Sequence, residues 1–331
     1  MLAPGGAISL KPMPARPMRP SEATTEWLKT ALEGDGYIAD QDIIISIYLA
    51  LRLAKPLLVE GAPGVGKTEI AKVLARVFET DLIRLQGYEG LDENKALYEW
   101  DYQKQLLRIQ ILREAGLAAE ESDLFSEEYL LERPLLRAIR AERCPVLLID
   151  EVDKCDPEFE AFLFEVLSDF TVSVPELGTI QARQIPMVVL TSNSERELSD
   201  GLRRRCVYLF IDFPSIEKEL RIVRSRVPEA SEKLAADVAR VVARVRELDL
   251  RKQPSIAETL DWTRALLALG AEKVDDALLA ETATLLLKNR DDVTILREAA
   301  GSSDGFVSEA LERGLGQVGG PAGVRGPGPT K

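Results

Sequence analysis

Residues 61–68 read Gly61-Ala62-Pro63-Gly64-Val65-Gly66-Lys67-Thr68 and match the phosphate-binding pattern G-x-x-x-x-G-K-[ST] without a gap. Glycines let a backbone turn tightly and aim successive N–H groups at phosphate oxygens. In this pattern the lysine, Lys67, reaches the β- and γ-phosphates, and the hydroxyl of Thr68 ligates Mg²⁺. The stretch therefore predicts that all eight residues surround the phosphates of a nucleoside triphosphate.

The sequence on either side of this loop supports the interpretation. Residues 57–60 are mostly apolar and predict a buried strand that leads into the loop. Residues 69–78 predict a helix that leaves it, and the positive end of a helix dipole adds to an anion site. Strand, loop and helix in this order distinguish a phosphate loop from a glycine-rich turn that binds nothing.

A second motif combines an apolar strand with two carboxylates. Residues 146–149 are four consecutive apolar residues, typical of a strand buried on both faces of a parallel sheet. Asp150 and Glu151 follow directly, at the strand end where open α/β sheets place their ligands. We expect Asp150 to hold Mg²⁺, directly or through water, and Glu151 to orient and deprotonate an attacking water.

Two further stretches carry candidate site residues. An apolar run at 188–190 ends in polar residues, of which Asn193 is placed to hydrogen-bond the γ-phosphate or the water, unless it is a simple turn former. Arg203, Arg204 and Arg205 precede an apolar strand expected at 207–211. Consecutive arginines are usual on solvated or nucleic-acid-binding surfaces, but before a core strand in an acidic protein they suit an arginine finger, which stabilises charge on the transferred phosphoryl group.

Composition limits the classes of function. The chain has 331 residues and a net charge of −13, which argues against a broad nucleic-acid-binding face. It contains no histidine, so acid–base work falls to carboxylates. Its three cysteines have no metal-ligand spacing, and we expect reduced thiols and a cytoplasmic location. No apolar run approaches the ~20 residues of a membrane span, and no secretion signal is evident at the N-terminus.

We expect four parts along the chain. A proline-rich disordered tail covers residues 1–20, an α/β domain with a parallel sheet in three layers covers 21–214, a smaller all-helical lid domain covers 215–298, and a Gly/Pro-rich disordered tail covers 299–331. Within the α/β domain, helices are also expected at 21–32, 40–53 and 127–139, and a strand at 82–85. The turn at Tyr37 and Ile38 is where an adenine rests in folds of this layout, although such residues are more often plain core.

The phosphate loop, the motifs LLIDE, LTSN and LRRRC, and the helical lid, in this order, resemble an AAA+ ATPase. The stretches RLQGYEGLDENKALYEW and DPEFEAFLFEVLSDF, with the region between them, are similar to the MoxR family. Within that family the chain looks closest to the ATPases that mature molybdenum-containing carbon monoxide dehydrogenase. The resemblance covers roughly residues 30 to 290.

The resemblance implies a chaperone-like, ATP-hydrolysing enzyme that uses ATP and Mg²⁺ and forms rings, commonly hexamers. Such proteins often act with a partner carrying a von Willebrand A domain to activate a metalloenzyme client. It further implies an insert within residues 87–105 that faces the ring pore. Asn193 matches the family's sensor asparagine, and Arg205, with Arg204 beside it, matches the arginine that acts on the neighbouring subunit's nucleotide.

One departure concerns the lid. Many relatives carry a lid arginine that touches the γ-phosphate, but here the corresponding stretch reads Ser255-Ile256-Ala257-Glu258-Thr259, and Arg264 lies further along. A nucleotide-binding scaffold with little turnover therefore stays open as an alternative, against which the Asp150–Glu151 pair argues. An AAA+ nucleic-acid motor or loader is the other alternative, disfavoured by the net charge of −13.

Overall fold

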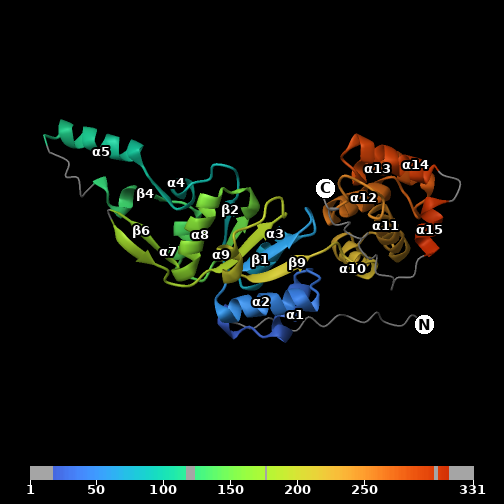
Figure 1. Cartoon of the computed structure of the whole chain (residues 1–331), viewed down its shortest axis with the longest axis horizontal. Helices are drawn as coiled ribbons and strands as arrows, with labels where there is room; N and C mark the ends of the chain where they lie inside the picture. Colours follow the sequence, from blue (N-terminus) through green and yellow to red (C-terminus); the bar gives the residue numbers. More distant parts are fainter. Residues whose placement is uncertain (1–17, 117–123, 176, 302–304, 313–331) are drawn as a thin grey trace, which may run out of the picture.

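The computed structural model describes residues 18–116, 124–175, 177–301 and 305–312. Of the tails expected at 1–20 and 299–331, residues 1–17, 302–304 and 313–331 lie outside the described residues. The described chain forms a sheet domain followed by a helical domain (Figure 1). An elongated insert projects from the sheet domain at the end opposite the helical domain (Figure 1).

The sheet domain is built on five parallel strands in the order β2-β5-β8-β1-β9. Their bounds are β1 Leu57–Gly61, β2 Leu82–Gln86, β5 Val146–Asp150, β8 Met187–Ser192 and β9 Val207–Ile211. Every residue of β1, β5 and β8 is buried, which explains why their sequences are near-continuous apolar runs. The polar residues that end these strands consequently meet at one edge of the sheet.

Helices cover both faces of the sheet (Figure 1). One face carries α1 Thr25–Gly34, α2 Gln41–Leu53 and α3 Lys67–Val77, and the other carries α7 Pro134–Arg140, α8 Pro157–Asp169 and α9 Asp200–Arg205. Leu57 and Val59 pack in the core under the first set, whereas Leu58 packs in the core under the second. Because successive side chains of a strand point to opposite faces of the sheet, one strand contributes to the core on each side. The expected three-layer α/β fold is confirmed.

The first helix begins later than the expected residue 21. Pro20–Glu22 form a short 3-10 turn, and α1 starts only at Thr25, where the side chain of Thr24 accepts a hydrogen bond from the N–H of Trp27. A threonine that satisfies a free N–H of the first turn is a good helix cap, and this cap decides the boundary. The following helix, α2, agrees with its expected range to within one residue.

The connection from β2 to α7 is a longer and more structured insert than residues 87–105. It contains α4 Glu93–Ala96, β3 Tyr98–Trp100, α5 Tyr102–Glu114, η2 Glu127–Tyr129 and β4 Leu130–Glu132. The helix expected at 127–139 is wrong in its first half, because β4 pairs antiparallel with β3. The helix α7 starts at Pro134, whose missing N–H is tolerated only in the first helical turn.

A hairpin that no sequence pattern indicated follows α8. Its strands are β6 Thr171–Val174 and β7 Gly178–Gln181, paired antiparallel from Thr171↔Gln181 to Val174↔Gly178. Val172 and Val174 are buried against the same core as α7 and α8, while Ser173 between them is exposed. The hairpin therefore lies beside the insert on one side of the sheet domain (Figure 1).

The lid domain is all-helical, as expected, but extends beyond residue 298. Its helices are α10 Ile216–Arg226, α11 Glu232–Val245, α12 Ile256–Ala268, α13 Asp276–Leu286, α14 Arg290–Ala300 and α15 Phe306–Glu312. The last of these falls where a tail was expected, so that boundary is corrected. Phe306, Val307 and Ala310 share one helix face and are buried in the lid core, which outweighs the glycines nearby. Among the described helices, none combines the length and apolarity needed to cross a membrane.

Candidate nucleotide site

The phosphate loop lies between β1 and α3, and its lysine already contacts the loop backbone. Lys67 Nζ donates to the carbonyl oxygens of Gly61 at 2.6 Å and Ala62 at 2.8 Å, and to Asn193 Oδ1 at 2.8 Å. Burial lowers the pKa of Lys67, while Asp153, Asp150 and Glu151 act in the opposite direction. An ammonium group in this position, held by neutral oxygens, is suited to exchange them for charged phosphate oxygens.

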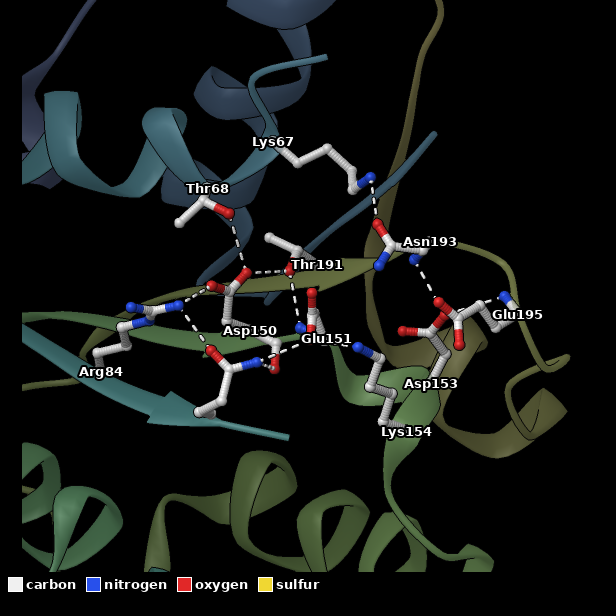
Figure 2. A network of polar contacts seen from close by, with 11 residues as sticks. Lys67, Thr68, Arg84, Asp150, Glu151, Asp153, Lys154, Thr191, Asn193 and Glu195 are labelled. Atoms are coloured by element: carbon white, nitrogen blue, oxygen red, sulfur yellow. Dashed lines mark hydrogen bonds and ion pairs between the residues drawn. The ribbon is translucent and has the colours of Figure 1, made fainter. Parts of the chain in front are cut away.

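Asp150 is the centre of a polar network at the carboxyl edge of the sheet (Figure 2). Its Oδ1 accepts from Thr68 Oγ1 at 3.0 Å and from Thr191 Oγ1 at 2.5 Å. Its Oδ2 accepts from Arg84 at 2.6 Å. These donors come from α3, β8 and β2, so the carboxylate joins three elements that are distant in sequence.

Glu151 is held in an unusual backbone conformation. Its φ of 56° lies in the left-handed region, and its N–H donates to Thr191 Oγ1 at 2.9 Å. Its Oε2 accepts from Gln86 Nε2 at 3.0 Å and from Lys154 Nζ at 2.8 Å. Non-glycine residues with positive φ persist only where surrounding contacts enforce them, and such residues cluster at functional sites.

Close approach of β2 fixes the backbone beside Glu151. The N–H of Gly87 donates to the carbonyl oxygen of Asp150 at 2.6 Å. A Cβ at Gly87 would lie 2.2 Å from the carbonyl oxygen of Glu151, which no side chain can occupy without moving that backbone. Glycine at this position is therefore a condition for the arrangement of the two carboxylates.

Asn193 is set by a second acidic residue, Asp153. The carboxylate Oδ2 of Asp153 accepts the backbone N–H groups of Asn193 and Glu195, each at 3.0 Å (Figure 2). Asp153 is buried in the 3-10 turn that follows β5. Two charge-assisted hydrogen bonds to one loop hold the amide of Asn193 against Lys67.

The arginines expected to act on a nucleotide lie elsewhere. They form the last turn of α9. Arg204 pairs only loosely with Asp200, at 3.7 Å, and its side chain is 82% exposed. Arg205 lies over the ring of Phe164, 5.0 Å from its centroid. These contacts do not join either arginine to the cluster around Lys67 and Asp150.

A cavity of about 340 Å³ adjoins the phosphate loop between the sheet domain and the lid. Its walls are formed by Tyr37 and Ile38, by the loop at Gly64 to Gly66, and by residues of α12. Burial is the main cause that raises the pKa of Tyr37, so its phenol stays neutral at physiological pH. The cavity places the Tyr37–Ile38 turn beside the phosphate loop, where the sequence expected an adenine.

The lid reaches the phosphate loop through the start of α12. The N–H of Ile256 donates to the carbonyl oxygen of Gly64 at 3.3 Å. Gly64 has a φ of +80°, and a Cβ there would lie 2.3 Å from Cβ of Ser255. The stretch from Ser255 to Thr259 thus meets the loop without an arginine, while Arg264 lines the cavity further along the helix.

Sequence reasoning missed Arg84, Gln86, Asp153 and Thr191. Gln86 follows the strand expected at 82–85, but its place opposite Asp150 depends on the register of β2 against β5, which the chain order alone does not give. For Arg84 and Asp153 the partners lie 66 and 40 residues away in the chain, so nothing local marks their roles.

Residues 56–206 match the sequence profile of the AAA domain, dynein-related subfamily. The gas vesicle ATPase GvpN1 of Halobacterium salinarum is 23% identical over 280 residues, which are 79% of this chain and 77% of that protein. The chaperone protein ClpB of Mycoplasma genitalium is 27% identical over 177 residues, which are 52% of this chain but only 20% of that protein.

Solved structures also align with the chain. RuvB of Thermotoga maritima, a Holliday junction branch migration motor, aligns with 18% identity and a TM-score of 0.41 over 81% of this chain and 68% of that chain. The profile covers the phosphate loop, both carboxylates and all three arginines of α9. The sheet order and the loop described above give residues 56–206 an α/β fold of the AAA+ type, in agreement with the profile that they match.

Proposed function

We propose that this chain binds ATP with Mg²⁺ and hydrolyses it to ADP and phosphate. The observation that carries the proposal is the convergence of Lys67, Thr68, Asp150, Glu151 and Asn193 at one edge of the sheet (Figure 2). They come from the ends of two strands, β5 and β8, and from the start of one helix, α3. The AAA domain match supports the same chemistry.

The residues present fit a magnesium ion. Thr68 Oγ1 and Asp150 Oδ1 are 3.0 Å apart, close to the roughly 2.9 Å between neighbouring oxygens of an octahedral shell with bonds of about 2.05 Å. A hydroxyl, one carboxylate and waters with phosphate oxygens are the usual Mg²⁺ ligands at such sites. When bound there, the ion would neutralise charge on the phosphates. Thr68 and Asp150 would hold it.

In the proposed reaction Glu151 takes a proton from water as the water oxygen attacks the γ-phosphorus. The bond from that phosphorus to the β–γ bridging oxygen breaks, and ADP leaves with the electron pair. Gln86 and Lys154 both donate to Glu151, and these contacts orient its carboxylate. Lys67 and Asn193 position the γ-phosphate and the water.

We further propose that hydrolysis is completed between subunits of a ring, commonly a hexamer. Arg204 and Arg205 lie outside their own site, and Arg204 is largely exposed, as a group that enters a neighbour's site must be. Such an arginine is worth about 10³–10⁵ in rate in other phosphoryl-transfer enzymes.

The output of the cycle is proposed to be remodelling of a protein client. Similarity to a gas vesicle ATPase and to the chaperone protein ClpB supports this class. Resemblance to the MoxR family adds a von Willebrand A partner and a client metalloenzyme, in particular a molybdenum enzyme. The insert offers Tyr88, which is exposed, whereas Trp100 is buried beside Tyr98 and Phe125 and so is a core residue rather than a contact.

Two substitutions test the assignment of roles. Lys67→Ala removes the positive charge that neutralises the phosphates of bound ATP, so it should weaken binding of a fluorescent ATP analogue. Glu151→Gln should bind the analogue normally but should not hydrolyse ATP. Lys72→Ala, an exposed position on the same helix, is the matched control. Equal loss of affinity in both site variants would overturn the division of roles.

Stimulation of turnover by DNA and not by protein partners would favour a nucleic-acid motor instead.

A further inference from the structure

A buried acidic residue stands directly before the phosphate loop. Glu60, in β1, is only 6% exposed. Its Oε2 accepts the Tyr208 hydroxyl at 2.9 Å and lies 3.5 Å from Arg203 Nη2. The guanidinium of Arg203 also lies over the Tyr208 ring, 5.4 Å from its centroid. The proposed hydrolysis assigns these three residues no role.

The position of Glu60 links two functional elements of one subunit. The next residue, Gly61, gives its carbonyl oxygen to Lys67 Nζ at 2.6 Å. Along β1 the side chain of Glu60 is on the same face as Leu58, which shares a core with Leu202 of α9. Glu60 thus extends from the base of the phosphate loop to the helix that ends in the three arginines.

The three arginines differ in what they contact. Arg203 points inward to Glu60 and is 34% exposed. Arg204 points into solvent, and Arg205 covers Phe164. Because successive residues of a helix project about 100° apart, anchoring Arg203 fixes the directions in which the other two project.

Stability alone does not account for this cluster. Burying a carboxylate is costly, and an apolar side chain at the same place is often neutral or favourable for folding. The partner Arg203 is partly exposed, so its attraction is screened by solvent. A charge at this position is better explained by the alignment that it enforces between the loop and α9.

We propose that Glu60 is a positioning residue, which couples the phosphate loop of one subunit to the arginines that this subunit offers to its neighbour. Movement of the loop around phosphates shifts the end of β1, and Glu60 passes the shift through Arg203 to Arg204 and Arg205. The state of one site then affects hydrolysis in the next. The inference rests on the proposed role of Arg204 and Arg205 in the neighbouring site.

The test uses mixed rings of full-length chains. Acceptor subunits carry Arg204→Ala and Arg205→Ala, so their own sites are intact but they supply no arginine. Donor subunits carry Glu151→Gln, so they supply arginines but do not turn over. Mixing should restore ATP hydrolysis. Adding Glu60→Gln to the donor should reduce the restored rate about 10-fold or more, since misplacement of about 1 Å can cost 10²-fold.

The matched control is a donor that carries Glu281→Gln, an exposed change in the lid, which should leave the restored rate unchanged. Binding of a fluorescent ATP analogue to the Glu60→Gln chain should also be unchanged, because the effect is in the neighbour. Arg203→Gln in the donor should lower the rate as Glu60→Gln does, and the two together should be no worse than either. This second variant serves if Glu60→Gln fails to fold.

Each outcome decides the matter. If the donor that carries only Glu151→Gln does not restore ATP hydrolysis although the subunits exchange between rings, the role of Arg204 and Arg205 in trans is wrong, and the inference about Glu60 is wrong as well. If restoration occurs but the Glu60→Gln donor equals the Glu281→Gln donor, the inference alone is overturned. Weaker ATP binding by the Glu60→Gln chain itself would also overturn it, because Glu60 would then act only on its own loop.

Discussion

The carboxyl edge of the sheet and the insert between β2 and α7 are built in opposite ways. At the sheet edge, the buried carboxylates of Asp150 and Asp153 accept hydrogen bonds from several elements (Figure 2). In the insert, α5 exposes Leu106 at 61% and buries only Gln105. The edge holds its polar groups in fixed positions, as the proposed hydrolysis requires, whereas the insert exposes apolar side chains on a helix with little buried surface.

The largest expected effect is at the centre of the edge. Asp150→Ala removes the acceptor shared by Thr68, Thr191 and Arg84, together with the proposed Mg²⁺ ligand. We expect ATP hydrolysis to fall by about 10³-fold or more, as for the loss of a principal electrostatic group. Steady-state phosphate release measures this. Activity within a few-fold of the wild type would place the chemistry elsewhere.

A smaller loss is expected from the residue that sets Asn193. Asp153→Ala leaves the N–H groups of Asn193 and Glu195 without their acceptor, at a cost of about 1–3 kcal/mol in the free energy of unfolding. Because Asn193 then loses its position, kcat should fall about 10–100-fold, with KM changed less. Chemical denaturation and a kcat and KM determination separate the two effects. Unchanged kcat would show that Asp153 only supports the loop structure.

In the insert we expect a core substitution to lower stability without changing basal ATP hydrolysis. Trp100→Ala removes a buried ring that packs on Tyr98 and Phe125 where the insert joins the core of the sheet domain, and loss of a buried aromatic costs about 3–5 kcal/mol in the free energy of unfolding. Hydrogen exchange should rise in β3, α5 and β4 while basal ATP hydrolysis stays within about two-fold. If basal hydrolysis collapsed as well, the insert and the site would form one cooperative unit, and the contrast would be wrong.

The smallest effect on basal ATP hydrolysis is expected from substitutions of the exposed side chains of α5. Leu106→Ser with Leu107→Ser should change the free energy of unfolding by no more than about 0.5 kcal/mol, since both side chains are exposed. Basal hydrolysis should be unchanged, and stimulation by a client or a von Willebrand A partner should be lost. Tyr88→Ala with Glu89→Ala tests the other end of the insert in the same assay. Retained stimulation in both double variants would remove the insert from client contact.

The difference between the sheet edge and the insert also explains which features the sequence could predict. Lys67, Asp150, Glu151 and Asn193 each follow an apolar run, so a local pattern marks both the strand and the residue at its end. β3 and β4 have three residues each and form only because they pair with each other across the insert. Such pairing leaves no local pattern. The helix expected at 127–139 is wrong in its first half for this reason.

Long-range polar contacts were missed for a related reason. Arg84 and Gln86 gain their significance from the register of β2 against β5, which the chain order alone does not give. The helix α15 was missed because glycines on both sides suggested a tail, while burial of Phe306 in the lid core supplied the stabilisation. Tertiary packing decided each of these cases.

The most direct test of the central claim is phosphate release from ATP by the wild-type chain and by Glu151→Gln, with Mg²⁺ and with the metal chelated. If Glu151 is the general base at a magnesium site, the wild type should turn over only with Mg²⁺, and the rate in Glu151→Gln should be at least about 10²-fold lower, within the range for loss of a general base. Glu158→Gln, an exposed change early in α8, should match the wild type. Equal rates for Glu151→Gln and the wild type, or turnover unaffected by chelation, would contradict the account.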